Sequence, residues 1–335
     1  MKAFALLALA LVPWSAKDAP IVVAVVDSGV DRSVPSLVTG YNAADGSTDT
    51  SDVGGHGTGV ASVVVETCGG CRILPVRIAD ESGSSTQGTI AAGIRWAADH
   101  GARVINLSWG LAVGGRSTGQ VERAIAGAVA GGATVTLAVM NDGSRDPHLN
   151  PWASRSPDAV RVAAVDGDGR LQPSSNRGVW VDIGARASAT SGAAPRVAGA
   201  AAVVLAAHPG LTGLQVRAAL RRGCAVSPAL DLGWHCLLDV DGAVRAAGSP
   251  VQTHRLTVAK VGSGVVGATG AAIQCGEFCA DRLDTGTVVT LTAAPARGSK
   301  LVRWQGACRT TKPKPVCVVR ISRPATATAV FARRR

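Results

Sequence analysis

The sequence predicts an α/β fold: a three-layer domain with a mostly parallel sheet, followed by a small all-β module. Between residues 20 and 248, strand-like and helix-like stretches alternate, as they do in parallel sheets covered by helices. From residue 253 to residue 332 the pattern changes to short apolar runs separated by glycines, which is typical of an all-β unit. With 335 residues and 47% hydrophobic content, the chain is long enough to bury two cores.

Residues 1–16, MKAFALLALALVPWSA, are expected to form a secretory signal peptide. Lys2 precedes an apolar run from Ala3 to Val12 that is too short to span a bilayer, and the small Ala16 closes the segment. Trp14 fits poorly at the third position before a cut after Ala16, so the cleavage position stays open. A buried strand is the alternative, but the early lysine and the polar break after Ala16 disfavour it. We therefore expect a secreted or cell-envelope protein.

The elements of the α/β domain follow one another in a regular order. The run IVVAVVD at 21–27 is continuously apolar and predicts a strand buried on both faces. The same reasoning predicts strands at 72–80, 103–110, 133–142 and 159–169, and helices at 56–67, 86–101 and 118–132.

The segment ATSGAAPRVAGAAA at 189–202 predicts a buried helix that stops at Pro209 and Gly210. Pro195 is expected in its first turn, where a helix has no internal donor to lose. Ser191 stands at the amino end, where free N–H groups and the helix dipole favour negative charge. Taken alone, its hydroxyl is expected to cap the helix.

The all-β module begins after a linker, AGSPVQ, at 247–252. Alternating apolar residues predict strands at 254–261, 287–295, 300–306, 316–322 and 325–332. Two cysteine pairs in the module would staple a core that is small on its own.

Eight cysteines fit an exported protein, because an oxidising compartment permits disulfides. CGGC at 68–71 also matches a redox motif or half of a zinc site. However, a redox CxxC is expected to open a helix after a strand, whereas this one follows a helix, and no second CxxC completes a zinc site. The simplest pairing is local: Cys68 with Cys71, Cys224 with Cys236, Cys275 with Cys279, and Cys308 with Cys317.

The net charge of +11 is concentrated at one end of the chain. Residues 297–335 hold 11 of the 34 basic residues and no Asp or Glu, and the other 23 basic residues balance the 23 acidic ones. Such a patch favours anionic partners, among which we expect a cell-surface polymer. A solubilising surface is the alternative. Nucleic acid is disfavoured because no nucleic-acid-binding motif accompanies the charge.

Three polar residues stand where chemistry is expected in such a fold. Asp27 ends the first strand, His56 opens a helix within GGHGTG, and Ser191 opens the apolar helix. Alone, each could be a turn residue, a helix start or a cap. Together they supply a nucleophile, a general base and an orienting carboxylate, with Asn141 at a further strand end in AVMNDG.

These segments resemble the subtilisin-like serine proteases. VVDSGVDRSVPSL is similar to the family's aspartate segment, GGHGTGVAS to its histidine segment and ATSGAAPRVAG to its serine segment, in the same order. VINLSWG, AVMNDG and SSNRGVWVDIG match three further segments, so the resemblance spans about residues 20–245. The tail resembles repeat modules of bacterial secreted proteins through QCGEFC, GTVVTLTAAPARGSKLVRWQGAC and ATAVFA.

The resemblance implies a serine endopeptidase that acts on proteins or peptides. Asp27 would orient His56, and His56 would take the proton from Ser191. Asn141 would bind the oxyanion together with the Ser191 backbone N–H. Ser108, Trp109 and Gly110 would pair with the substrate backbone and line the first specificity pocket.

Four positions depart from the family pattern: Gly59, Met140, Gly192 and Arg196. Met140 has the largest consequence, because it replaces a glycine whose backbone forms a wall of the specificity pocket. If its side chain points into the pocket, small residues should be preferred; if it points into the core, it only packs. A further expectation is that folding needs no inhibitory prodomain or receives one in trans, because Lys17–Pro20 alone separate the signal from the first strand.

Two other functions compete with the endopeptidase. One is a binding or adhesion protein with an inactive protease fold, which the joint retention of the four catalytic candidates disfavours. The other is an α/β-hydrolase esterase, which would need a G-x-S-x-G elbow and a different triad order. We expect a monomer that needs no cofactor for catalysis. Structural calcium is common in the family, but DGSTD at 45–49 is too generic to assign a site.

Overall fold

The computed structural model describes residues 20–111, 115–228, 230, 232, 235–276, 278–308 and 314–334. The expected signal peptide, residues 1–16, lies outside these residues.

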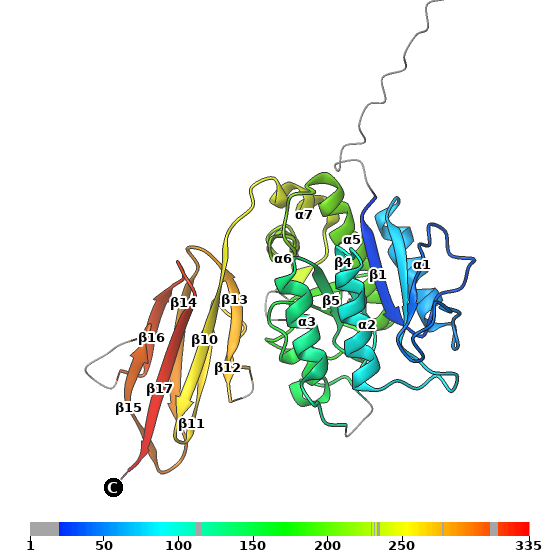
Figure 1. Cartoon of the computed structure of the whole chain (residues 1–335). Helices are drawn as coiled ribbons and strands as arrows, with labels where there is room; N and C mark the ends of the chain where they lie inside the picture. Colours follow the sequence, from blue (N-terminus) through cyan, green and yellow to red (C-terminus); the bar gives the residue numbers. More distant parts are fainter. Residues whose placement is uncertain are drawn as a thin grey trace, which may run out of the picture.

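A nine-stranded sheet forms the centre of the first domain (Figure 1). Its strand order is β2-β3-β1-β4-β5-β6-β7-β9-β8, and only the pair β8–β9 is antiparallel. The five predicted strands are present, and the four additional ones are short. The strands are β1 (Val22–Asp27), β2 (Tyr41–Asn42), β3 (Arg72–Arg77), β4 (Val104–Leu107), β5 (Thr134–Ala138), β6 (Val160–Val165), β7 (Ile183–Arg186), β8 (Ala225–Val226) and β9 (Cys236–Leu237).

Helices cover both faces of this sheet, which confirms the predicted three-layer architecture. One buried cluster of apolar residues joins a face of the sheet to α1 (His56–Cys68), α5 (Thr190–Ala207), α6 (Gly213–Arg222) and α7 (Val240–Ala247). A second cluster joins the other face to α2 (Gln87–Asp99) and α3 (Gln120–Ala130). Two short helices, η1 (Pro147–Leu149) and α4 (Pro151–Ser154), follow β5.

Helix α5 is the predicted buried helix, but the expected place of Pro195 is wrong. Its N-cap is Ala189, so Ser191 is the second helical residue and its hydroxyl makes no capping bond. Pro195 lies inside the helix rather than in its first turn. The helix is long and apolar enough to cross a membrane, but 67% of it is buried inside the domain. It packs closely on α1, because a Cβ placed on Gly199 would lie only 2.9 Å from the Val64 carbonyl oxygen.

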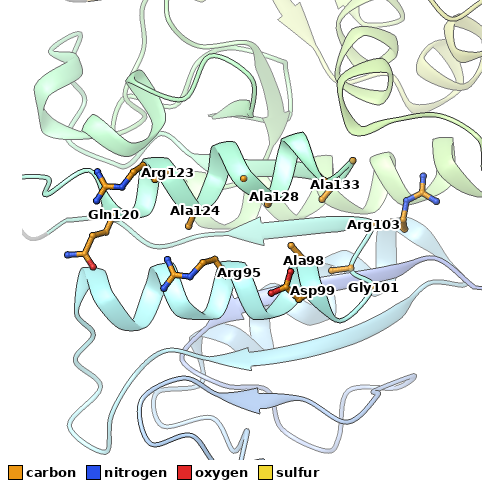
Figure 2. A pocket seen from close by; sticks show the side chains of 14 residues that line it. Arg95, Ala98, Asp99, Gly101, Arg103, Gln120, Arg123, Ala124, Ala128 and Ala133 are labelled. Atoms are coloured by element: carbon orange, nitrogen blue, oxygen red, sulfur yellow. The ribbon is translucent and has the colours of Figure 1, made fainter.

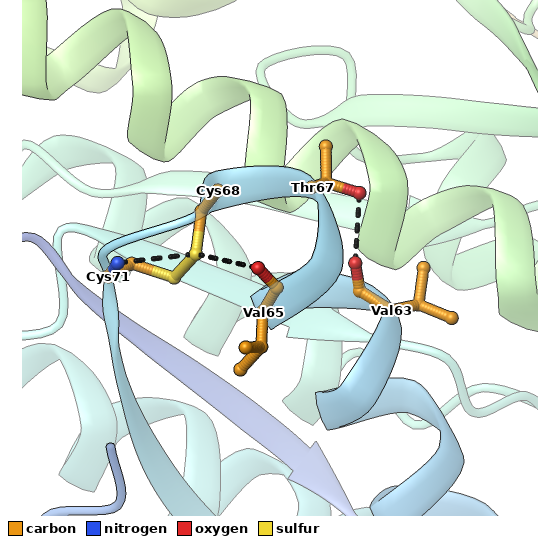
Figure 3. Close-up of a disulfide and its surroundings, with 5 residues drawn as sticks. All are labelled: Val63, Val65, Thr67, Cys68 and Cys71. Atoms are coloured by element: carbon orange, nitrogen blue, oxygen red, sulfur yellow. Dashed lines mark hydrogen bonds between the residues drawn. A yellow bond between two sulfur atoms is a disulfide. The ribbon is translucent and has the colours of Figure 1, made fainter. Parts of the chain in front are cut away.

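All eight cysteines are paired, in the four local disulfides that the sequence predicts. Cys68 ends α1, and its partner Cys71 precedes β3, so this disulfide closes the turn between the two elements (Figure 3). Gly69 ends the helix in the left-handed conformation, with φ of 67°. The CGGC segment is therefore a structural staple here.

The C-terminal module is a sandwich of two four-stranded sheets. One sheet has the order β13-β10-β17-β15 and the other β12-β11-β14-β16, and apolar residues from both form a common core. The prediction of an all-β module is confirmed, although the strands at 264–269, 274–275 and 280–284 were not predicted. The strands are β10 (Thr253–Val261), β11 (Gly264–Thr269), β12 (Gln274–Cys275), β13 (Ala280–Asp284), β14 (Val288–Pro295), β15 (Ser299–Gly306), β16 (Val316–Arg320) and β17 (Ala325–Arg333).

Candidate active site

The carboxylate of Asp27 and the imidazole of His56 are in direct contact. Asp27 is the last residue of β1 and is fully buried, and His56 is the first residue of α1. The distance between Asp27 Oδ1 and His56 Nδ1 is 2.7 Å. The backbone N–H of Ser28 donates to the same oxygen at 2.8 Å. Two contacts thus fix Oδ1 of the carboxylate, which orients the ring so that its other nitrogen, Nε2, remains for a reaction partner.

Glycine at position 57 allows this contact. A Cβ on Gly57 would collide with the carbonyl oxygen of Gly29 and would lie 3.0 Å from Cβ of Asp27. Only a residue without a side chain lets the first turn of α1 approach the end of β1 so closely. By contrast, a Cβ on Gly59 would meet no atom within 4 Å.

Asp52 anchors the segment that leads into α1, and sequence reasoning missed it. Its Oδ1 accepts from Ser28 Oγ at 2.7 Å and from the N–H of Gly55 at 2.9 Å. Its Oδ2 accepts from both the N–H and the hydroxyl of Thr58. Although burial opposes it, hydrogen bonds from Thr58 and Ser28 lower the pKa of Asp52. The sequence did contain a signal for Asp52. It is a carboxylate four residues before the histidine that opens a helix, and negative charge is favoured at helix amino ends.

The environment of His56 favours its protonated form. Its hydrogen bond to Asp27 raises its pKa above 6.5, burial opposes the shift, and the charges of Asp27 and Asp52 support it. The imidazole is 42% exposed, so it can reach a substrate. The Trp109 ring stands edge-on to it, with centroids 6.2 Å apart. A raised pKa and an accessible ring are what a general base needs in order to hold a proton during a reaction.

The backbone of Ser191 is tied to the sheet through its carbonyl oxygen. Because Pro195 has no N–H, this oxygen lacks the usual helical donor from four residues later. The hydroxyl of Ser108 donates to it instead at 3.1 Å. A buried chain stands behind that bond: Asn106 Nδ2 donates to Ser108 Oγ, and Thr136 Oγ1 donates to Asn106 Oδ1, both at 3.0 Å.

Asn141 lies beside the start of α5. Its Oδ1 accepts from the backbone N–H of Thr190, the residue before Ser191, at 2.9 Å. This bond fixes the amide so that its Nδ2 donors face away from Thr190, and within the described residues they bond to no other group. Exposed amide hydrogens next to a helix amino end can bind negative charge.

Asn176, in the segment SSNRGVWVDIG, encloses the loop that carries Asn141. Its Oδ1 accepts from the N–H groups of Asp142 and Ser144, each at 3.0 Å, and its Nδ2 donates to the Val139 carbonyl at 2.9 Å. Its own N–H donates to the carbonyl of Met140. The segment matches the family pattern, but nothing in the sequence near Asn176 marks it as the residue that holds the loop.

Met140 adopts a backbone conformation that suits glycine. Its φ is 75°, in the left-handed region that bulky residues rarely occupy. Its side chain lies directly against Gly110, since a Cβ on Gly110 would overlap Sδ and Cε of Met140 and lie 3.1 Å from Cγ. The Met140 side chain therefore reaches across to the 108–110 segment.

One of the hollows in this domain adjoins the site. A groove of about 560 Å³ is lined by Ser84–Gln87, Ile90, Trp109–Leu111, Gly115, Arg116 and Trp152. Another, of about 540 Å³, lies between α2 and α3 and includes Arg95, Arg103 and Arg123 (Figure 2). None of the catalytic candidates lines the second hollow. Among the described residues, no group of three or more His, Cys, Asp or Glu side chains could hold a metal ion.

Comparisons with known proteins match both parts of the chain to families. Residues 18–232 match the subtilase family and residues 255–335 match the divergent InlB B-repeat domain. The thermophilic serine proteinase of Bacillus sp. (strain AK1) is 35% identical over 229 residues, which cover 60% of this chain and 55% of that protein. Thermitase of Thermoactinomyces vulgaris is 33% identical over 227 residues, covering 59% of this chain and 78% of thermitase.

Solved structures show the same fold. A cold-adapted subtilisin-like serine proteinase is 29% identical, with a TM-score of 0.56 over 64% of this chain and 88% of that one. Fervidolysin from Fervidobacterium pennivorans, described as keratinolytic, has a TM-score of 0.63 over 89% of this chain and 55% of its own, at 23% identity.

Proposed function

Because the chain belongs to the subtilase family, we propose that it is a secreted serine endopeptidase with Asp27, His56 and Ser191 as its catalytic triad. The contact of 2.7 Å between buried Asp27 and His56 carries the proposal, because it joins a base to its orienting carboxylate at the carboxyl edge of a parallel sheet. The four disulfides support an oxidising, extracytoplasmic location. The expected signal peptide at 1–16 agrees with it.

In the proposed reaction, Ser191 Oγ attacks the peptide carbonyl while His56 Nε2 takes its proton. The negative charge that develops on the carbonyl oxygen is bound by Asn141 Nδ2 and the Ser191 N–H. Loss of one such donor in a related enzyme costs about 3–4 kcal/mol of barrier. His56 then returns the proton to the leaving amine, the C–N bond breaks, and water hydrolyses the acyl-enzyme by the same steps.

Removal of the nucleophile tests the proposal. Ser191→Ala should abolish casein hydrolysis and labelling by a fluorophosphonate probe while the circular dichroism stays native, because alanine suits a helix start. His56→Ala should cost about as much, because members of a triad act as a unit. Near-native turnover by either variant would contradict the assignment.

We further propose that Met140 restricts the residue before the scissile bond to small side chains. The position of its Sδ and Cε against Gly110 supports this, because both segments are expected to border that pocket. The same strand-like segment, Ser108 to Gly110, would pair with the substrate backbone.

We also propose that the C-terminal module binds an anionic cell-surface polymer. All eight Lys and Arg residues of the described part of 297–334 are exposed, which supports an open cationic surface. Retention of the Ser191→Ala protein on purified cell walls at about 50 mM salt, and its release at about 300 mM, is the expected result. Retention that does not change with salt would contradict an electrostatic mode.

A further inference from the structure

A cluster of buried arginines lies at the amino ends of β6 and β7, on the edge of the sheet opposite the catalytic candidates. Arg161 is in β6, and Arg217 and Arg221 are in α6; their side chains are 1%, 2% and 10% exposed. Three buried guanidinium groups in one place carry a large desolvation cost unless carboxylates accompany them.

The first domain supplies one fully buried carboxylate to this cluster, that of Asp182. Arg161 donates to both of its oxygens, at 2.8 and 3.0 Å, and Arg217 donates to one of them at 2.8 Å. Although burial opposes it, the charges of Arg161 and Arg217 lower the pKa of Asp182. Asp182 is thereby hydrogen-bonded to two arginines of the cluster.

The second carboxylate comes from the C-terminal module. Asp281 in β13 is fully buried, and its Oδ1 lies 3.6 Å from Arg217 and 4.0 Å from both Arg161 and Arg221. Its other oxygen accepts from the N–H of Ala272 at 2.9 Å, which fixes the carboxylate within the module. One carboxylate thus faces all three arginines from across the boundary between the two parts of the chain.

The next residue, Arg282, also contacts the first domain through both its backbone and its side chain. Its carbonyl oxygen accepts from Arg217 Nη1 at 3.3 Å and from Arg221 Nη1 at 3.0 Å. Its guanidinium donates to Asp158, just before β6, at 2.6 Å. Each part of the chain therefore presents both an acceptor and a donor to the other, with a geometry that a loosely tethered module could not maintain.

An aromatic side chain completes the contact. Phe278 of the module is 5% exposed and belongs to the apolar cluster of the α/β domain, not to the core of its own sandwich. Its ring lies 6.1 Å from that of Trp180, which precedes β7. The Cys275–Cys279 disulfide closes the short turn that presents it.

We propose that the C-terminal module is an integral stabilising partner of the protease domain, with Asp281 as the counter-ion of the arginine cluster and Phe278 as the apolar anchor. The two parts then unfold as one cooperative unit. The linker at 247–252 connects parts that are already docked, rather than allowing the module to move freely.

The test uses the full chain with Ser191→Ala as background, so that no self-cleavage occurs and the result does not depend on the proposed activity. Asp281→Asn keeps the shape of the side chain and removes its charge. We expect a single unfolding transition in the background protein and a midpoint lower by roughly 5–15 °C after the substitution, because an arginine loses its buried counter-ion. The control is Asp284→Asn on the same strand, whose side chain is 31% exposed and 4.0 Å from Arg222, and which should leave the midpoint within about 2 °C.

A second experiment measures the association of the two parts directly and does not require the Asp281 variant to fold. A specific protease site inserted between Pro250 and Val251 allows the linker to be cut, and the two fragments should still co-elute in gel filtration at micromolar concentration. Phe278→Ala should weaken this association. Fragments that separate after cutting, or two independent unfolding transitions with an unchanged midpoint in Asp281→Asn, would overturn the proposal.

Discussion

Met140→Gly tests the proposed origin of substrate preference most directly. In the structure, the Met140 side chain fills the space against Gly110 from a backbone position with φ of 75°. Glycine at this position removes the side chain and also adopts the left-handed backbone without strain. The substitution should therefore open the pocket. The loop should stay in place, because Asn176 holds it through a hydrogen bond to the backbone carbonyl of residue 140.

The size of the effect follows from the area that a larger substrate side chain could bury. A phenylalanine buries at least about 150 Å², which at about 25 cal/mol per Å² corresponds to about 4 kcal/mol. About half of this is expected as preference over alanine, because alanine already fills part of the pocket and the ring stays partly solvated. A difference of about 2 kcal/mol is about 30-fold in the kcat/KM ratio of Phe to Ala substrates. Stability should change by less than about 1 kcal/mol, because relief of strain offsets the entropy that glycine loses on folding.

The assay compares kcat/KM for peptide pairs that differ only in the residue before the scissile bond, with enzyme concentration set by active-site titration. Met140→Ala removes the bulk but keeps the strained backbone, so it should also gain Phe cleavage. Met140→Leu keeps the bulk and should behave like the native protein. Equal Phe-to-Ala ratios in the native protein and the Gly variant would refute the idea that Met140 narrows the pocket, and a change in the Gly variant alone would assign the effect to the backbone.

Three further predictions concern the positions of the catalytic groups. Catalysis needs neutral His56, and the bond to Asp27 raises the pKa of His56 above 6.5, so kcat/KM should fall as the pH drops through that raised value. In Asp27→Asn, a pH profile of kcat/KM should show this fall at a lower pH and a much lower rate throughout. Gly57→Ala should reduce kcat/KM by at least about 100-fold, because its Cβ would collide with the Gly29 carbonyl and displace His56 from Asp27. In the control Gly59→Ala, the new Cβ has no atom within 4 Å, so activity on the same peptide should stay native. Ser108→Ala leaves the Ser191 carbonyl without a donor and should lower the free energy of unfolding in urea by about 1–3 kcal/mol; an unchanged value would show that this bond contributes little.

The sequence was sufficient for features whose signal is local. The continuous apolar run of β1 and the amphipathic pattern of α2 and α3 identify those elements without knowledge of their partners. Short strands such as β8 and β9 have no such signal, because two residues cannot establish a period. Cysteines close in sequence could be paired correctly because their separation leaves few alternatives.

Features that depend on distant residues could not be predicted in this way. Asp281 and Arg282 look like surface charges on a strand, since nothing near them in the chain shows that arginines from α6 will cover them. Asn106 and Asn176 are buried amides whose side-chain oxygens accept from residues 30 or more positions away. The place of Pro195 was misjudged for the same reason, because the hydroxyl that replaces its missing N–H belongs to Ser108, 83 residues from Ser191.

The two edges of the central sheet carry different groups of charged residues, and the distance between these groups has a consequence for function. At the carboxyl edge, buried Asp27 faces His56; at the amino edge, arginines and carboxylates bind the module. The six residues of β6 place about 20 Å between these edges. The charged groups that shift the pKa of His56 are Asp27 and Asp52 at its own edge, and neither belongs to the cluster that fixes the module. An anionic polymer bound to the exposed basic residues of the module could hold the protein at a surface without altering the protonation of its catalytic base.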